Sequence, residues 1–312
     1  MGEVDPAFIQ ALEHRPKPDP IEADNVPLID LSPLNSLESL VAEIREACEK
    51  WGFFQVINHG VPFRFREKIE SVYREFFALP KEEKNKVARD EVNPTGYYDT
   101  EHTKNVRDWK EVFDFTIQVP TLIPATHEPG DQELKEMINH WPHNPAEMRE
   151  VCEVYAAETS FMRLNHYPAC PAPQLALGLG RHKDAGAMTI LAQDEIGGLE
   201  VKRKLDGEWV FVKPITDAYI VNVGDLIQVW SNDKYESVEH RVTVNSHKER
   251  FSIPFFINPS HSVWVEPLKE MINEQNPAKY KGYSWGKFYA TRKLSNFKKL
   301  TSENIQVHHF KL

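Results

Sequence analysis

The spacing of apolar residues along the chain changes near residue 160. Before it, apolar side chains recur mostly at intervals of three and four residues, which is typical of amphipathic helices. After it, short apolar runs alternate with turn residues, which is typical of strands in an antiparallel sheet. The pattern therefore predicts a helical N-terminal region followed by a β-rich region.

Two helices and a strand are predicted before residue 80. The first helix follows Ser36, a favourable N-cap residue, and ends before Gly52. The next segment, FFQVIN, predicts a short strand. A second helix, which carries several aromatic residues, ends at Leu79 because Pro80 disfavours its continuation.

Two further segments complete the N-terminal region. Residues 89–130 are polar and weakly periodic, so we expect a long loop with one possible strand at VFDFTIQV. Another helix is expected from Pro145 to Ala157. Asn144 would cap it, Pro145 would occupy its first position, and Glu147 lies three residues after the cap.

The β-rich region reads as the strands of an antiparallel barrel or sandwich. Its strand-like segments are SFMRLNHY, AMTILAQD, LEVKR, EWVFVK, AYIVNV, LIQVW, EHRVTV, RFSIPFFI and SVWVEP. The segment Lys204-Leu205-Asp206-Gly207 predicts a hairpin turn. From about Tyr280 the pattern becomes polar and helical again.

Composition and charge restrict the function. A chain of 312 residues can bury a large core. Its formal charge of -10 and its lack of a Lys/Arg block argue against nucleic acid or an anionic membrane as the main partner. The first residues show no signal-peptide pattern, and the three cysteines form no CxxC pair. We therefore expect a cytoplasmic protein that acts on a small molecule.

Titratable residues stand directly before one predicted strand, in GRHKDAGAMTILAQD. On an extended chain His182 and Asp184 point to one face, while Arg181 and Lys183 point outward to water. This geometry suits two ligands of one metal ion. On its own it is weak evidence, because about one His-x-Asp is expected by chance in a chain with 13 histidines. At this point a solvated strand end is the simpler interpretation.

A second cluster downstream favours the metal hypothesis. His240 opens an apolar strand, and two histidines with one carboxylate form the facial triad of non-haem Fe(II) oxygenases. Catalytic zinc also takes three protein ligands, so zinc stays open. Arg250 and Ser252 share one face of the following strand, and the arginine fork matches a carboxylate. These residue types indicate an anion site close to the metal.

Other polar residues alternate on the same predicted strands. In RLNHYP, Arg163, Asn165 and Tyr167 share one face, where they would either hydrogen-bond an oxygen-rich cofactor or be ordinary polar side chains of a strand. Phe256 and Asn258 continue the face of Arg250. Both are candidates for substrate contact, with core packing as the alternative for Phe256.

Taken together, these motifs resemble the plant 2-oxoglutarate- and Fe(II)-dependent dioxygenases, the class of flavonol synthase, anthocyanidin synthase and gibberellin oxidases. The similar stretch runs from about residue 26 to 300 and contains FFQVINHGVP, DWKEVFDF, SFMRLNHYPACP, His182-x-Asp184, His240 and Arg250-x-Ser252. The resemblance implies a mainly β fold with flanking helices, built on a double-stranded β-helix or jelly roll. It also implies an N-terminal mixed α/β region at 1–157 and a dioxygenase domain with a C-terminal helical segment at 158–312.

The resemblance also implies the roles of the candidate residues. His182, Asp184 and His240 match the iron ligands and so the catalytic centre. The residues that match contacts to 2-oxoglutarate are Arg250, Ser252, Asn165 and Tyr167. The implied reaction consumes O2, is supported by ascorbate and releases succinate and CO2. It hydroxylates or desaturates a small plant metabolite such as a flavonoid, a hormone or a related specialised compound, and we expect a monomeric enzyme.

The chain departs from the resemblance between Ala157 and Ser160. Relatives place a long helix and a loop there, so on the order of thirty residues are missing, which would shorten a helix by tens of ångströms. Such a loss would expose apolar surface. Two alternatives stay open: an iron-dependent oxidase that does not use 2-oxoglutarate, and a catalytically impaired binding or regulatory variant.

Some residues of the motifs have simpler structural interpretations. His59, in NHGV, lies in a predicted turn and is expected to be structural. Trp109, Phe113 and Phe115 would either cover the mouth of a pocket or pack in the core.

Overall fold

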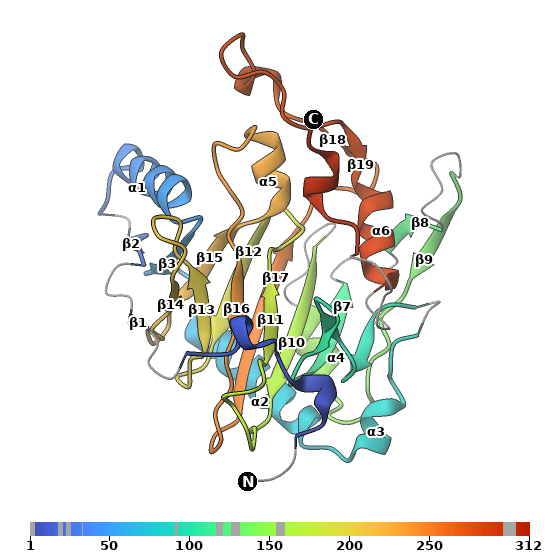
Figure 1. Ribbon diagram of the computed structural model, residues 1–312. Coiled ribbons are helices and arrows are strands. Elements are labelled where there is room, and N and C mark those ends of the chain that lie inside the picture. Colours follow the sequence, from blue (N-terminus) through green and yellow to red (C-terminus); the bar gives the residue numbers. More distant parts are fainter. Residues whose placement is uncertain are drawn as a thin grey trace.

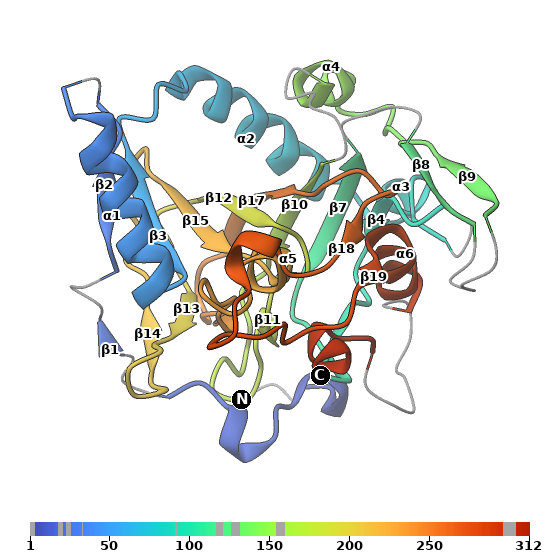
Figure 2. The same ribbon diagram turned by 90° about the horizontal axis from the view of Figure 1, so that it is seen from above.

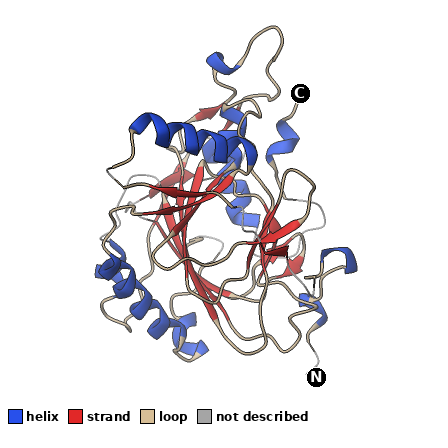
Figure 3. Ribbon diagram, turned by 90° about the vertical axis from the view of Figure 1, so that its left-hand side faces the viewer, coloured by secondary structure: helices blue, strands red, loops and turns tan. Residues whose placement is uncertain are grey.

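The computed structural model describes residues 4–17, 21–22, 26–32, 34–90, 93–116, 121–125, 132–153, 160–295 and 304–312. Strands form the centre of the molecule, and helices lie around them (Figures 1 and 3). The helices are α1 (Leu37–Lys50), α2 (Phe63–Phe77), α3 (Lys81–Asn85), α4 (Met148–Glu153), α5 (Asp225–Trp230) and α6 (Trp285–Ser295). Short 3-10 helices are η1 (Pro6–Phe8), η2 (Leu12–His14), η3 (Lys269–Met271) and η4 (Val307–Phe310).

Two sheets enclose the centre. The smaller contains, in spatial order, β1 (Ile21–Glu22), β14 (Trp209–Phe211), β13 (Leu199–Lys202), β16 (His240–Val242) and β11 (Leu179–His182). The larger contains β2 (Leu28–Asp30), β3 (Phe53–Ile57), β15 (Tyr219–Val223), β12 (Met188–Gln193), β17 (Arg250–Ile257), β10 (Phe161–Tyr167), β7 (Glu111–Thr116) and β4 (Gly96–Tyr98). Most neighbours pair antiparallel, as predicted for the β-rich region.

Three two-stranded ribbons border these sheets. They are β5 (His102–Thr103) with β6 (Val106–Arg107), β8 (Thr121–Pro124) with β9 (Leu134–Met137), and β18 (Trp264–Val265) with β19 (Tyr283–Ser284). Among the described residues, every helix is too short or too polar to cross a bilayer.

Alternation along the strands separates two apolar layers. On β3, Phe53 packs between the two sheets with Val201, whereas Phe54 packs beneath α1 with Ala47. On the outer face of the larger sheet, α2 places Phe76 in the cluster that contains Phe251 of β17. Figure 2 shows α1 and α2 along the outside of this sheet. The inner faces of β10 and β17 are thereby left to line the centre.

Several local predictions are confirmed. The hydroxyl of Ser36 accepts a hydrogen bond from the Ser39 N–H and caps α1, and Gly52 takes the left-handed conformation (φ +66°) just after it. The strand at FFQVIN is β3, and the aromatic helix is α2. The predicted hairpin joins β13 to β14, with Gly207 at φ +75°.

Other local predictions are wrong. In the region 89–130, expected to be a long loop with one possible strand at VFDFTIQV, that strand is confirmed as β7, but β4, β5, β6 and β8 were not expected. β4, β5 and β6 have only two or three residues each, which is too short to leave a period of apolar residues in the sequence. The segment LIQVW belongs to helix α5, since a short apolar run does not distinguish a strand from a buried helix.

The helix expected at Pro145 begins only at Met148. The Met148 N–H donates to the carbonyl of Pro145, a turn bond across three residues, and helical bonding starts later, between Val151 and Glu147. Residues 154–159, where the missing segment is expected, lie outside the described residues. The deletion at that place stays a prediction.

Candidate active site

Three predicted metal ligands converge at the ends of β11 and β16. His182 ends β11 and is the direct antiparallel partner of His240 at the start of β16, while Asp184 lies two residues beyond β11. Oδ1 of Asp184 lies 3.5 Å from Nε2 of His182 and 3.6 Å from Nε2 of His240. Atoms that bind one ion at about 2.1 Å lie roughly 3 to 3.5 Å apart. The donor set therefore fits a single metal ion.

Backbone carbonyls orient the two imidazoles. Nδ1 of His182 lies 2.9 Å from the oxygen of Gly180, and Nδ1 of His240 lies 3.1 Å from the oxygen of Val238. Because a carbonyl only accepts, Nδ1 carries the hydrogen in both rings and Nε2 keeps its lone pair. Burial and the neighbouring His182 lower the pKa of His240 to about 4, so this ring is neutral at neutral pH. Both Nε2 atoms are thus available as ligands.

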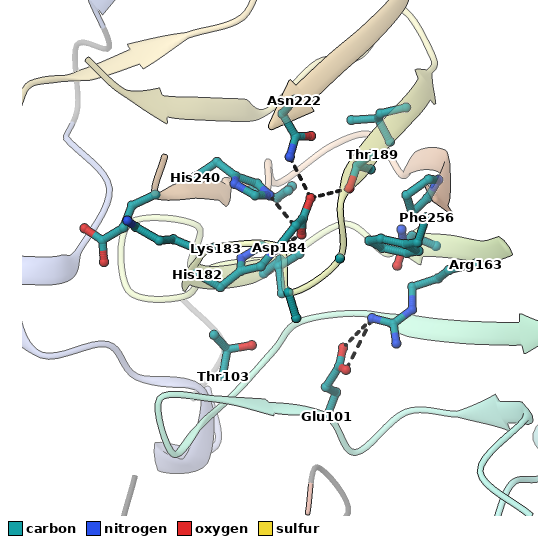
Figure 4. A pocket seen from close by; sticks show the side chains of 18 of the residues that line it. Glu101, Thr103, Arg163, His182, Lys183, Asp184, Thr189, Asn222, His240 and Phe256 are labelled. Atoms are coloured by element: carbon teal, nitrogen blue, oxygen red, sulfur yellow. Dashed lines mark hydrogen bonds and ion pairs between the residues drawn. The ribbon is translucent and has the colours of Figure 1, made fainter. Parts of the chain in front are cut away.

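Two polar side chains hold Asp184 (Figure 4). Its Oδ2 accepts hydrogen bonds from Oγ1 of Thr189 at 2.6 Å and Nδ2 of Asn222 at 2.8 Å. Burial alone would raise the pKa of Asp184, but the two imidazoles and the Thr189 hydroxyl outweigh burial and hold this pKa below its usual range. The side chain is therefore anionic. Sequence reasoning missed Asn222, although it is a polar residue inside the apolar run AYIVNV.

A cavity of about 450 Å³ lies beside these ligands. Alternation along β10 and β17 turns every second side chain toward it, as the sequence pattern predicts. The predicted site residues that line this cavity are His182, Asp184, His240, Asn165, Tyr167, Arg250, Ser252, Phe256 and Asn258. The structure thus brings these nine residues to one place.

Arg250 is a buried cation with neutral hydrogen-bond partners. Its side chain donates to Oγ of Ser252 at 3.2 Å and to Oε1 of Gln193 at 3.0 Å. Its Nε has no hydrogen-bond partner in the described part of the chain, and the same holds for Oδ1 of Asn165. A buried guanidinium is costly without an anion. The arrangement fits a ligand that carries a carboxylate, as 2-oxoglutarate does.

Arg163 also lines the cavity, but its donors are already used. It donates to both carboxylate oxygens of Asp114, at 2.7 and 3.0 Å, and to those of Glu101, at 3.1 and 3.3 Å. A further bond reaches the hydroxyl of Tyr98. Arg163 therefore fastens Glu101 at the edge of the cavity, as Figure 4 shows. Its role among the candidates is structural.

Four other residues of the motifs are also structural. Phe113 and Phe115 lie in the core beneath α2, and the indole of Trp109 donates to the carbonyl of Pro168. Of the two interpretations of these aromatics, packing is confirmed. His59 bonds the carbonyl of Asp217 and accepts from a nearby backbone N–H, as expected for a turn residue.

The outward orientation expected for Lys183 is wrong. Lys183 is half-buried and borders the cavity, because β11 ends at His182 and strict alternation ends with it. Arg181, which is still within the strand, pairs with Glu239 at 2.8 Å.

Comparison with known proteins identifies the family. The chain matches the 2OG-Fe(II) oxygenase superfamily over residues 158–259 and the N-terminal region of the non-haem dioxygenases in morphine synthesis over residues 26–144. Feruloyl CoA ortho-hydroxylase F6H1-3 of Ipomoea batatas is 37% identical over 295 residues, covering 88% of this chain and 82% of the relative. This chain belongs to the 2-oxoglutarate- and Fe(II)-dependent oxygenases.

A solved structure supports the same conclusion. The crystal structure of JOX2 in complex with 2OG, Fe and JA superposes with a TM-score of 0.80 at 31% identity, and it covers 100% of this chain and 95% of JOX2. The predicted jelly-roll fold, dioxygenase chemistry and requirement for Fe(II) and 2-oxoglutarate are confirmed.

Another relative bears on the length of the chain. DMR6-like oxygenase 2 of Arabidopsis thaliana is 33% identical over 324 residues, covering 90% of this chain and 88% of the relative. Because 324 exceeds the 312 residues of the chain, this relative contains residues that have no counterpart here.

Proposed function

We propose that His182, Asp184 and His240 hold the catalytic Fe(II), and that the adjoining cavity oxidises a small plant metabolite by hydroxylation or desaturation. The observation that carries this proposal is the convergence of three ligand atoms beside a buried arginine in one cavity. When bound, Fe(II) together with 2-oxoglutarate and O2 supplies the oxidising chemistry, with release of succinate and CO2. The side chains bind, orient and exclude water.

Arg250 and Ser252 anchor the far carboxylate of 2-oxoglutarate in this proposal. Arg250 presents a planar set of donors from the inner face of β17, and Ser252 adds a hydroxyl 3.2 Å away. Asn165 and Tyr167 stand opposite on β10 and supply further polar contacts. This anchor favours a 2-oxoglutarate-dependent enzyme over an iron oxidase that does not use 2-oxoglutarate.

The substrate side of the cavity has an aromatic wall. Phe161 and Phe256 stack with their ring centres 4.5 Å apart, and Tyr289 meets Phe161 edge-on at 6.2 Å. Flat apolar walls fit flat apolar groups. The wall therefore supports an aromatic or phenolic metabolite, with Asn258 as a polar contact, and the name of the feruloyl CoA ortho-hydroxylase is consistent with this class.

We further infer that the regions 1–157 and 158–312 build one catalytic unit. The two family matches end and begin near this boundary. Strands of both regions share the larger sheet, since β3 pairs with β15 and β7 pairs with β10. We propose a cytoplasmic monomer. The charge of -10 without a basic cluster supports a small-molecule substrate rather than nucleic acid or a membrane surface.

A screen for succinate tests the proposal. The protein is supplied with Fe(II), ascorbate, 2-oxoglutarate and a panel of plant phenolics and hormones, and succinate is measured with and without each compound. We expect succinate release that depends on one class of compound and is lost in Asp184→Ala, which lacks the anionic ligand.

Other outcomes would contradict it. Turnover of a metabolite without succinate would assign an oxidase that does not use 2-oxoglutarate. A folded protein that binds neither iron nor 2-oxoglutarate would be a non-catalytic variant.

A further inference from the structure

Asp108, the first residue of the motif DWKEVFDF, is a buried carboxylate that hydrogen-bonds the strand carrying His182. The side chain of Asp108 is 0% exposed, and its Oδ1 accepts the N–H of Gly180 on β11 at 2.9 Å. Its Oδ2 accepts the hydroxyl of Thr103 on β5 at 2.8 Å. Asp108 therefore joins β11 to the ribbon β5–β6, which we call the rim hairpin (residues 102–107). Figure 4 shows Thr103 on this ribbon near the metal ligands.

The rim hairpin packs directly against β11. A Cβ at Gly180 would lie 2.9 Å from Cβ of Thr103 and 3.0 Å from its methyl group, so only glycine permits this approach. Three residues of the hairpin, His102, Thr103 and Lys104, border the cavity. The hairpin is thus part of the cavity rim and is in contact with the strand behind the metal site.

The contact at Gly180 leads to the imidazole of His182. The carbonyl of Gly180 is the acceptor that fixes Nδ1 of His182, at 2.9 Å. Asp108 holds the same residue from its N–H side. A rotation of the Gly180 backbone would therefore turn the ring and move Nε2 away from Asp184 and His240.

Charged neighbours hold Asp108 in place. Nζ of Lys110 lies 3.8 Å from Oδ2 of Asp108 and 2.6 Å from Glu101, and Glu101 is fastened in turn by Arg163. The backbone here is tied separately, because the Trp109 N–H donates to the carbonyl of Leu177 at 2.9 Å. Loss of the Asp108 side chain therefore removes the bond to Gly180 and leaves this backbone tie intact.

We propose that Asp108 is a positioning residue for the metal site: it fastens Gly180 and the rim hairpin and thereby holds the imidazole of His182 in register with the other two ligands. This inference rests on the proposed role of His182 as a metal ligand. Partners that orient a ligating histidine commonly contribute 10- to 100-fold to metal affinity or activity.

Co(II) is the probe for the test, since it accepts the same ligand types and its visible absorption reports ligand geometry. Burial raises the pKa of Asp108 to about 6, so the titrations are done well above that value. In Asp108→Ala we expect Co(II) binding weaker by on the order of tenfold and a changed absorption spectrum. Thr103→Val removes only the hydroxyl bond to Asp108, so it should produce a smaller change in the same direction. This variant replaces Asp108→Ala as the test if Asp108→Ala does not fold.

Asp108→Asn tests whether the hydrogen bonds of Asp108 or its negative charge position the metal site. The amide oxygen accepts the Gly180 N–H and the amide N–H2 donates to Thr103, so this variant should bind Co(II) within about threefold of the wild type. Asp233→Asn is the matched control, because Asp233 is a largely buried carboxylate that accepts bonds from Gln228 and Tyr280 away from the metal site. It should leave Co(II) affinity and the spectrum unchanged.

Three results would overturn the inference. One is wild-type Co(II) affinity and spectrum in a folded Asp108→Ala. If Asp108→Ala does not fold, the same result in a folded Thr103→Val would overturn the inference. Another is an Asp108→Asn as weak as Asp108→Ala, and the third is an equal loss in Asp233→Asn. If the wild type binds no Co(II), the proposed metal site fails as well, which distinguishes the two failures.

Discussion

Asn222 donates a 2.8 Å hydrogen bond to Oδ2 of Asp184, while Oδ1 of the same carboxylate is the oxygen near both imidazoles. Thr189 donates a second bond to Oδ2. With Oδ2 engaged twice, Asp184 offers one oxygen to a metal ion. Three protein ligands leave three positions of an octahedral ion open, whereas a carboxylate bound through both oxygens would take one of them. In the proposed metal site, Asn222 and Thr189 would therefore help to keep positions open for the cosubstrate and O2.

Asn222→Ala should leave Oδ2 of Asp184 with the Thr189 hydroxyl as its one remaining donor of these two, and weaken the site. We expect a 10- to 100-fold loss in apparent Fe(II) affinity or turnover, as for other partners of metal ligands. The measurement is an Fe(II) titration of succinate release, together with a Co(II) titration followed by absorption. Asn139→Ala is the control, because Asn139 is a buried amide that bonds Thr116. Unchanged metal affinity in Asn222→Ala would contradict this role.

Arg250→Lys should weaken the binding of 2-oxoglutarate. The lysine keeps the charge but loses the planar pair of donors, and a hydrogen bond to a charged group contributes about 1.5–3 kcal/mol. We therefore expect the apparent KM for 2-oxoglutarate to rise by on the order of 10- to 100-fold, with a smaller change in the KM for the metabolite. Arg203→Lys, at the surface pair with Asp206, is the control. Equal effects of the two variants would remove Arg250 as the anchor.

The residues proposed as metal ligands could be selected from the sequence because the selection depends on few, local features. A strand alternates its side chains, so His182, Arg250 and Ser252 could be assigned to faces before their partners were known. The same rule placed Phe256 on the cavity side. It failed at Lys183, because the strand ends one residue earlier. The rule was thus right within the strands, and beyond the end of β11 it was right for Asp184 but not for Lys183.

Long-range contacts could not be predicted in this way. β4 was not expected, because it has only three residues and leaves no local period, and its evidence is its pairing with β7. Asp108 and Asn222 are ordinary polar residues in the sequence. Their roles depend on Gly180 and Asp184, which are 72 and 38 residues away along the chain. The proposed metal ligands have a recognisable motif, but the residues that contact and orient them do not.

Glu111 makes stability dependent on pH. It accepts hydrogen bonds of 2.7 Å from each of His166, Lys84 and Tyr97. Burial alone would raise its pKa, but the bonds from His166 and Lys84 outweigh burial and lower the pKa to about 2, from an ordinary value of 4.5. The folded state therefore binds this proton less readily than the unfolded chain. The stabilisation is complete above pH 4.5 and is lost as the pH falls from 4.5 toward 2.

The magnitude of this effect is on the order of 3 kcal/mol, since one pKa unit corresponds to about 1.4 kcal/mol. Glu111→Gln should be less stable than the wild type at neutral pH by at least that order, because it also leaves the buried Lys84 without its carboxylate. The difference should shrink steadily as the pH falls below 4.5. Urea unfolding of both proteins across the acid range measures it. Glu46→Gln, at the exposed pair with Lys50, should show almost no such convergence, since exposed pairs contribute little. A constant difference between wild type and Glu111→Gln at all pH values would show that Glu111 acts through packing alone.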